Sequence, residues 1–327
     1  MYRRFLSKLL LFLVLIAGSM QLLFIGARKL EKPFFEDSTY AWVNHLHVHP
    51  KVILMGSSTV LVNLSPTIIA KRMGLANGEV INLAGGSKSA IQMYHLWHVI
   101  KPNRDSVRIV IFSVDPWIAY QSYYWIEDFS TLYWNPVQRL YPAFVENWPR
   151  YVMTGAVATY VAKKSAQHSF RLKPSSTQAP KDFGGEILDT HLENYREHAR
   201  EYFGPTTLFP ISQLYLDRLS ELKKEVEAQG AEFILLLPPK KNVWVSEYRS
   251  TCRDFDSDFV AHLNHALGPT KVIMSYDLFH QQEEDSLFMD QVHLTAKGRQ
   301  RFSDSVSSVL ANTSLIVKQP VRPLIDY

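Results

Sequence analysis

The sequence predicts an α/β fold built on a doubly wound, parallel five-stranded sheet, with one amino-terminal transmembrane helix and a helical insertion. Short apolar runs that do not alternate with polar residues predict the strands, because such runs are typical of strands buried on both faces. Segments of helical periodicity separate these runs, and strand–helix alternation favours a parallel sheet covered on both sides. A charge-free segment of membrane-spanning length predicts the transmembrane helix.

The strands are expected where apolar runs end in polar or glycine-rich turns, at residues 51–55, 79–83, 107–114, 232–237 and 271–276. The clearest helix is expected at 211–229, where apolar residues recur at helical spacing and Gly230 follows as a stop signal. Further helices are expected at 65–73, 90–101 and 295–311, the first of which begins with a typical Ser-Pro signal.

The amino-terminal segment 9–27 carries no charged residue, and Arg28 and Lys29 end it. As a helix it would span roughly 28 Å, close to the thickness of a bilayer core. A cleaved signal peptide is the alternative, because residues 17–19 are small enough for a cleavage site. The apolar run resumes at Leu22, however, which favours an uncleaved anchor. The numbers of basic residues before and after the segment are nearly equal, so charge does not decide its orientation. The short tail before the segment favours an amino terminus inside the cell and a following domain outside.

Three segments are therefore expected: a membrane anchor at 1–30, a juxtamembrane link at 31–50, and an α/β domain at 51–327. An insertion at about 117–210 interrupts this domain and is too long for one crossover. It begins rich in aromatic residues and then becomes polar. Extra helices at the sheet edge would explain it, as would a surface that faces saccharide, bilayer or a membrane partner, and the sequence leaves these alternatives open.

Composition excludes several functional classes. The formal net charge of +4 and the lack of basic runs interleaved with aromatics argue against nucleic-acid binding. Cys252 is the only cysteine, so no internal disulfide can form. His45, His47 and His49 alternate, which makes a metal site conceivable, but a polar link before Pro50 is the favoured interpretation. No nucleotide-binding loop or zinc spacing occurs, and no cofactor or metal is predicted.

Candidate site residues follow the first three expected strands. Gly56-Ser57-Ser58 follows the first and precedes a helical region, Asn82 and Gly85-Gly86 follow the second, and Asp115 follows the third. Because the carboxyl ends of parallel strands meet at one edge of a sheet, we expect these groups to gather there.

A second group of candidate residues lies near the carboxyl terminus. Asp290 and His293 are three residues apart, and on a helical turn they would share a face. An aspartate there can fix the imidazole tautomer, so that the other nitrogen accepts a proton from a serine. The two groups of residues together predict nucleophilic catalysis by a serine, a histidine and an aspartate.

These motifs together resemble the SGNH or GDSL hydrolase superfamily, which has an α/β, flavodoxin-like fold. The resemblance rests on Gly56-Ser57-Ser58, on Asn82 to Gly86, and on Asp290 to Gly298, and it covers about residues 51–311 without the insertion. Ser57 replaces the aspartate of the family's usual Gly-Asp-Ser. With an amino-terminal anchor, Gly-Ser-Ser is more similar to the exported subgroup that includes D-alanyl-lipoteichoic acid transfer and alginate O-acetylation proteins.

The resemblance implies that Ser58 is the nucleophile, rather than Ser57, that His293 is the base and that Asp290 orients it. It also implies an oxyanion hole built from the Ser58 N–H and from Gly85 or Gly86, with Asn82 in the same block. Asp115 stands near the place where the family has an asparagine donor, and losing one such donor costs about 3 kcal/mol. Poor hydrolysis of this kind would suit a transferase.

Two further positions keep alternatives open. Asp115 is either a site residue or a plain turn aspartate before Pro116, and the latter is slightly favoured. Lys240 and Lys241 either hold an anionic group of a polymer or lie in a solvated loop.

The function implied is acyl transfer through an acyl-Ser58 intermediate on an extracytoplasmic polysaccharide or teichoic-type polymer, from an anchor in the cytoplasmic membrane. A membrane-bound O-acyltransferase would be the partner that supplies the acyl group. A simple anchored esterase or lipase is one alternative, and a degenerate domain that binds polymer or acts as a scaffold is the other.

Overall fold

The computed structural model describes parts of residues 2–22, then 49–85, 89–99, 105–116, 119, 182, 211, 213–251, 255–280 and 283–311. The chain divides into two compact units, one formed by residues 1–42 and 122–177 and the other by residues 43–121 and 178–327. Described residues of the first unit lie between Tyr2 and Leu22, are helical, and expose apolar side chains such as Leu10 and Leu22. No helix in the described ranges is long and apolar enough to cross a bilayer. Residues 23–48 fall outside them, including the end of the expected anchor and most of the link.

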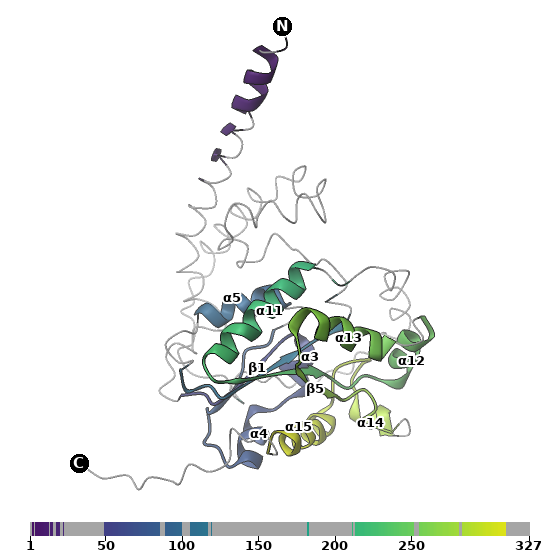
Figure 1. Cartoon of the computed structure of the whole chain (residues 1–327). Coiled ribbons are helices and arrows are strands. Elements are labelled where there is room, and N and C mark those ends of the chain that lie inside the picture. Colours follow the sequence, from purple (N-terminus) through teal and green to yellow (C-terminus); the bar gives the residue numbers. More distant parts are fainter. Residues whose placement is uncertain are drawn as a thin grey trace, which may run out of the picture. The chain divides into compact units, whose positions relative to one another are not determined.

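The second unit is built on one sheet of five parallel strands in the order β2-β1-β3-β4-β5 (Figure 1). The strands are β1 (Val52–Met55), β2 (Val80–Asn82), β3 (Ile109–Ser113), β4 (Glu232–Leu237) and β5 (Lys271–Met274). The prediction of a parallel five-stranded sheet is thus confirmed. The strand order reverses between β1 and β3, and in open α/β sheets ligands bind at the carboxyl ends of the strands beside such a reversal.

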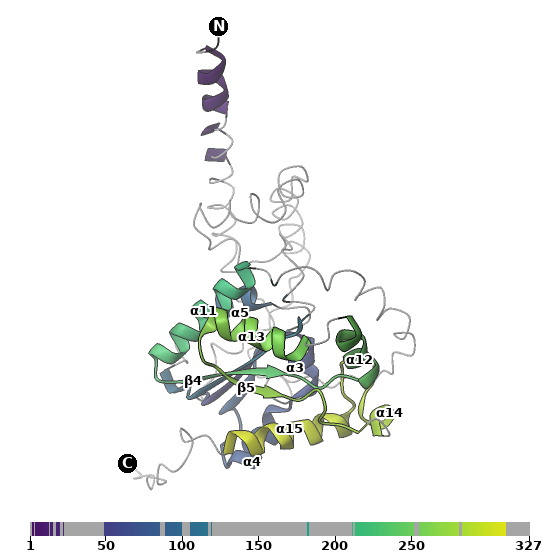
Figure 2. The ribbon, with the colours of Figure 1, turned by 45° about the vertical axis from the view of Figure 1, so that its right-hand side comes forward.

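Helices cover both faces of this sheet (Figures 1 and 2). One layer contains α5 (Ala90–Val99), α11 (Gln213–Ala228) and α13 (Phe255–Leu267), and the other contains α4 (Pro66–Met73) and α15 (Ala296–Ala311). Further helices of this unit are α3 (Ser58–Asn63), α12 (Asn242–Thr251) and α14 (Glu284–Leu287). The helices expected from periodicity are all present, whereas α12, α13 and α14 were not predicted.

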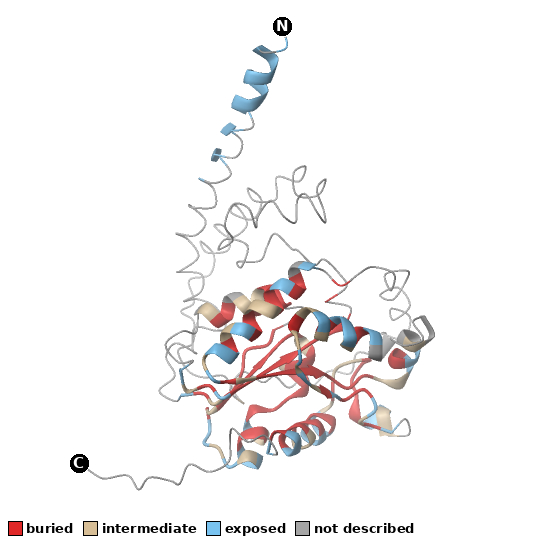
Figure 3. Ribbon diagram, in the orientation of Figure 1, coloured by how far each residue is buried: buried red, intermediate tan, exposed pale blue. Residues whose placement is uncertain are grey.

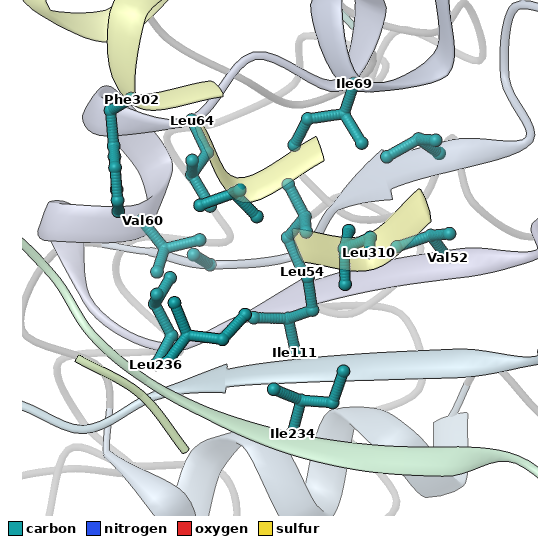
Figure 4. Packing of buried hydrophobic residues seen from close by; sticks show 14 of the residues in the cluster. Val52, Leu54, Val60, Leu64, Ile69, Ile111, Ile234, Leu236, Phe302 and Leu310 are labelled. Atoms are coloured by element: carbon teal, nitrogen blue, oxygen red, sulfur yellow. The ribbon is translucent and has the colours of Figure 1, made fainter. Parts of the chain in front are cut away.

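Alternate strand residues point to opposite layers, as the two-residue period of a strand requires. The central strands are almost entirely buried (Figure 3). On the α4 and α15 side, strand residues pack against helix residues in one apolar cluster (Figure 4), which includes Val52, Leu54, Ile111, Ile234, Leu236, Ile69, Phe302 and Leu310. On the other side, Phe112 and Phe233 stack with ring centroids 6.3 Å apart. This two-sided core holds the carboxyl ends of the strands in fixed positions.

One residue of the expected insertion is tied to this core. The Asp182 carboxylate accepts hydrogen bonds from Ser65 Oγ at 3.0 Å and from the Thr67 N–H at 2.9 Å, at the start of α4. It also pairs with the largely buried Arg299 of α15. Ala119, near the start of the insertion, is fully buried. The other insertion residues, 117–118, 120–181 and 183–210, lie outside the described ranges.

Candidate active site

Gly56 and Ser57 position Ser58 at the carboxyl end of β1. Gly56 has a φ of +136°, and a Cβ there would lie 2.8 Å from the Ser113 Cβ. Both the conformation and the space therefore require glycine. Ser57 then caps α3, because its Oγ accepts a hydrogen bond from the Thr59 N–H at 3.3 Å. This capped turn places Ser58 as the first residue of the helix.

A tight turn before α15 carries Asp290 and His293. The turn is closed by an antiparallel bridge between Phe288 and Leu294. Within it, Asp290 Oδ1 accepts hydrogen bonds from the N–H of Val292 at 2.8 Å and of His293 at 2.7 Å. These residues do not form a helical turn: one oxygen of the aspartate bonds its own following backbone, which is a common use of Asp at this spacing.

The structure brings Ser58, His293 and Asp290 into one chain of hydrogen bonds. His293 Nδ1 lies 2.6 Å from Asp290 Oδ2, and His293 Nε2 lies 3.0 Å from Ser58 Oγ. A carboxylate accepts the Nδ1 proton, which leaves Nε2 free to accept the serine proton. Burial alone would raise the pKa of Asp290, but the hydrogen bond and charge of His293 and the two N–H groups outweigh it and hold that pKa below its ordinary value. Asp290 therefore stays ionised beside the imidazole.

Ser57 has no comparable arrangement. It is 1% exposed, and its hydroxyl donates to Asp115 Oδ2, away from His293. Of the two serines, Ser58 is therefore the one whose hydroxyl lies against the imidazole.

Asp115 and Lys240 form a fully buried ion pair beneath the serine turn. The Lys240 Nζ lies 2.7 Å from Asp115 Oδ1, and both side chains are 0% exposed. Thr59 Oγ1 donates to Asp115 Oδ2 at 2.8 Å, beside the hydrogen bond from Ser57. Burial alone would raise the pKa of Asp115, but the charge of Lys240 and these hydrogen bonds keep it below its ordinary value.

This pair corrects two interpretations made from the sequence. Asp115 is neither a plain turn residue nor exposed to substrate, because its carboxylate is enclosed by Lys240, Ser57 and Thr59. Lys240 is not in a solvated loop, since it has a buried counterion, and only Lys241 lies nearer the surface, paired with Asp285 at 3.2 Å. Because lysine side chains are exposed far more often than buried, the sequence alone could not reveal that Lys240 is buried against Asp115.

Two of the predicted oxyanion and substrate-binding residues are already used in the scaffold. The Gly85 N–H donates to the Gly56 carbonyl at 3.1 Å. Asn82 Nδ2 donates to the Val60 carbonyl at 3.0 Å, and its Oδ1 accepts from the Ala84 N–H at 3.0 Å. The single Gly85 N–H is therefore already used, while Asn82 gives one of its two amide hydrogens and its Oδ1 to the scaffold. Gly86 lies outside the described residues.

The sequence did not point to Asn63, the last residue of α3. Its side chain is fully buried and bonds the backbone on both sides of His293. The sequence feature that could have identified Asn63 is a single amide side chain within the apolar stretch of residues 60–64. A buried amide needs hydrogen-bond partners for both its oxygen and its nitrogen.

Metal binding has little support in the described part of the chain. Within it, no group of three or more His, Cys, Asp or Glu residues could hold a metal ion. Of the alternating histidines, only His49 is described, and His45 and His47 lie outside.

Comparisons with known proteins give structural similarity alone. No protein-family model and no curated protein matches the sequence. Among solved structures, a putative lipolytic protein of the G-D-S-L family from Desulfitobacterium hafniense has 12% identity and a TM-score of 0.39, covering 79% of this chain and 98% of its own. A putative acylhydrolase from Bacteroides fragilis has 10% identity and a TM-score of 0.39, covering 84% and 96%. A catalytic mutant of an acetylxylan esterase from Geobacillus stearothermophilus has 11% identity and a TM-score of 0.39, covering 85% and 99%.

Proposed function

We propose that this protein is a serine enzyme acting on ester bonds, which passes an acyl group through an ester on Ser58. The observation that carries the proposal is the chain of hydrogen bonds from Asp290 through His293 to Ser58 Oγ, with contacts of 2.6 and 3.0 Å. A buried carboxylate, a histidine and a partly exposed serine in this order are the arrangement that nucleophilic acyl transfer needs.

The reaction balances with these three side chains. His293 Nε2 takes the Ser58 proton as Oγ attacks the ester carbonyl, and it returns that proton to the departing alkoxide. Water or an acceptor hydroxyl then loses a proton to Nε2 and attacks the acyl carbon. Collapse releases the acid or the new ester, and the Ser58 oxygen regains its proton from His293.

Charge balance beneath the site supports this chemistry. The Ser58 N–H has no acceptor among the described residues, which suits it to the oxyanion of the tetrahedral intermediate. A bare carboxylate at Asp115 would oppose a second negative charge nearby, since two like charges repel strongly where water is excluded. Lys240 neutralises that carboxylate at 2.7 Å, so the pair adds no net charge below the serine.

We further propose that the reaction is acyl transfer to or from hydroxyl groups of an extracytoplasmic polysaccharide or teichoic-type polymer, with a membrane-bound acyltransferase as partner. This finer proposal is supported by the apolar amino-terminal sequence, which would hold the enzyme at the cytoplasmic membrane, and by the resemblance of its motifs to exported O-acylation proteins. Simple ester hydrolysis is the second candidate, because the triad is complete within the chain and needs no partner group.

Fluorophosphonate labelling of the full-length chain in detergent tests the acyl-enzyme proposal. Wild type should be labelled, and Ser58→Ala and His293→Ala should not, because the first lacks the nucleophile and the second lacks its base. Ser308→Ala, an exposed serine on α15, is the matched control and should be labelled like wild type. A folded wild type that takes no label, or a Ser58→Ala variant that still does, would contradict the proposal.

Partition of the acyl group separates transfer from hydrolysis. With a chromogenic ester as donor and a soluble polysaccharide as acceptor, a transferase should place acyl groups on the polymer while releasing little free acid. An esterase should release free acid at the same rate with or without the polymer. A protein that is not labelled but still binds the polymer would support the degenerate, polymer-binding alternative.

A further inference from the structure

Helix α3 carries the nucleophile at one end and a buried amide at the other. Ser58 is its first residue and Asn63 its last. At about 1.5 Å per residue, the helix separates the two Cα atoms by roughly 7.5 Å along its axis. Asn63 is 0% exposed, so both ends of its amide need hydrogen-bond partners.

Asn63 finds both partners in the turn that carries the base. Its Nδ2 donates to the Val292 carbonyl at 2.7 Å, and its Oδ1 accepts from the Leu294 N–H at 2.8 Å. These two residues flank His293 on either side. The amide of one side chain therefore clamps the backbone immediately before and immediately after the imidazole.

The backbone groups of His293 itself are bonded within the turn. Its N–H donates to Asp290 Oδ1 at 2.7 Å, and its carbonyl accepts from the Met289 N–H at 2.8 Å. These bonds shape the turn, and the Lys241 N–H, which donates to the Gln291 carbonyl at 2.9 Å, ties it to the loop after β4 rather than to α3. Among the described residues, the hydrogen bonds from α3 to this turn are the two from Asn63 and the one between Ser58 and His293.

We propose that Asn63 is a positioning residue that fixes His293 to the same rigid helix as Ser58. The inference rests on the proposed function, and it deepens it by naming what sets the contact between base and nucleophile. A displacement of α3 then moves Ser58 and the His293 turn together, so that the 3.0 Å contact persists through small motions of the core. Proton transfer depends steeply on this contact, because misplacing a reacting group by about 1 Å can cost about a hundredfold in rate.

The test measures the second-order rate of fluorophosphonate labelling per folded molecule in the full-length protein. Asn63→Ala removes both hydrogen bonds, and Asn63→Asp keeps the side-chain size and the acceptor for Leu294 but loses the donor to Val292. We expect both variants to label about tenfold to a hundredfold more slowly than wild type. Asn63→Asp carries the test if Asn63→Ala does not fold.

Val306→Ala is the control for a loss of stability alone. Val306 is buried in the core on α15, and its apolar side chain takes no part in the hydrogen bonds of the triad. This variant should lower the melting temperature and yet label at a rate within about twofold of wild type.

A spectroscopic signal distinguishes positioning from general loosening. The Nδ1 proton of His293, held in the 2.6 Å bond to Asp290, should give a slowly exchanging proton resonance in wild type and in Val306→Ala. That resonance should broaden or vanish in the Asn63 variants.

Either folded Asn63 variant labelling within twofold of wild type, or keeping this resonance unchanged, would overturn the inference and leave the proposed function standing. A wild type that is not labelled would instead refute the proposed function, and the positioning role would fall with it.

Discussion

Replacing Lys240 with methionine would leave a buried carboxylate without its counterion. Methionine keeps an unbranched stem of similar reach, so the packing in the loop after β4 changes little while the ammonium group is lost. The Asp115 side chain, which is 0% exposed, would keep its hydrogen bonds from the hydroxyls of Ser57 and Thr59, but nothing would neutralise its charge. Lys240→Met therefore isolates the contribution of the ion pair.

The expected loss for Lys240→Met is about 3–5 kcal/mol of unfolding free energy, the usual cost of removing one partner of a buried ion pair. Lys241→Met is the matched control on the next residue. Its ammonium pairs with Asp285, whose side chain is 90% exposed, so the control should cost less than about 1 kcal/mol. The contrast between neighbouring lysines arises from burial, since both have a carboxylate within 3.2 Å.

Urea unfolding at neutral pH, followed by tryptophan fluorescence, measures both variants together with Asp115→Asn and the double variant Asp115→Asn/Lys240→Met. The double variant buries no charge and should be more stable than Lys240→Met, with a coupling energy of about 2 kcal/mol or more between the two sites. Equal losses from Lys240→Met and Lys241→Met, at unchanged denaturant slope, would refute the reasoning.

Two further predictions concern the carboxylates. Asp290→Asn should lower the labelling rate by about a thousandfold or more at neutral pH. An amide N–H facing Nδ1 of His293 forces the imidazole proton onto Nε2, and a protonated Nε2 cannot accept the proton of Ser58. Near-normal labelling would contradict the assigned tautomer. The free energy of unfolding should also fall as the pH drops through about 3.9, the ordinary Asp value, because the pKa values of Asp115 and Asp290 lie below it in the folded state. The two carboxylates contribute fully to the free energy of unfolding above that pH, and the contribution disappears as each is protonated in the folded state. In urea titrations at a series of acidic pH values, the free energy of unfolding of Asp115→Asn/Lys240→Met should decline less steeply than that of wild type. An unchanged decline would show that Asp115 does not contribute to the pH dependence.

Local patterns were sufficient for the parallel sheet and for most of the helices. Apolar runs such as 232–237 match the observed strand without a shift, because a strand buried on both faces imposes its composition directly. The same patterns missed α12 and α13. In α12, Val243 is exposed while its neighbours Trp244 and Val245 are buried, so adjacent apolar residues obscure the helical period.

The sequence by itself determined which residue types were available for catalysis and their order along the chain. Gly56 could be recognised because a serine turn after a strand often needs glycine, and Asp290 because it lies close to His293 in sequence. The contacts that complete the site join residues far apart: Asp115 with Lys240, and Asn63 with the turn around His293. Only the tertiary structure decided these, because a buried charge or amide is satisfied by whichever group the fold places beside it, and local sequence carries no record of that partner.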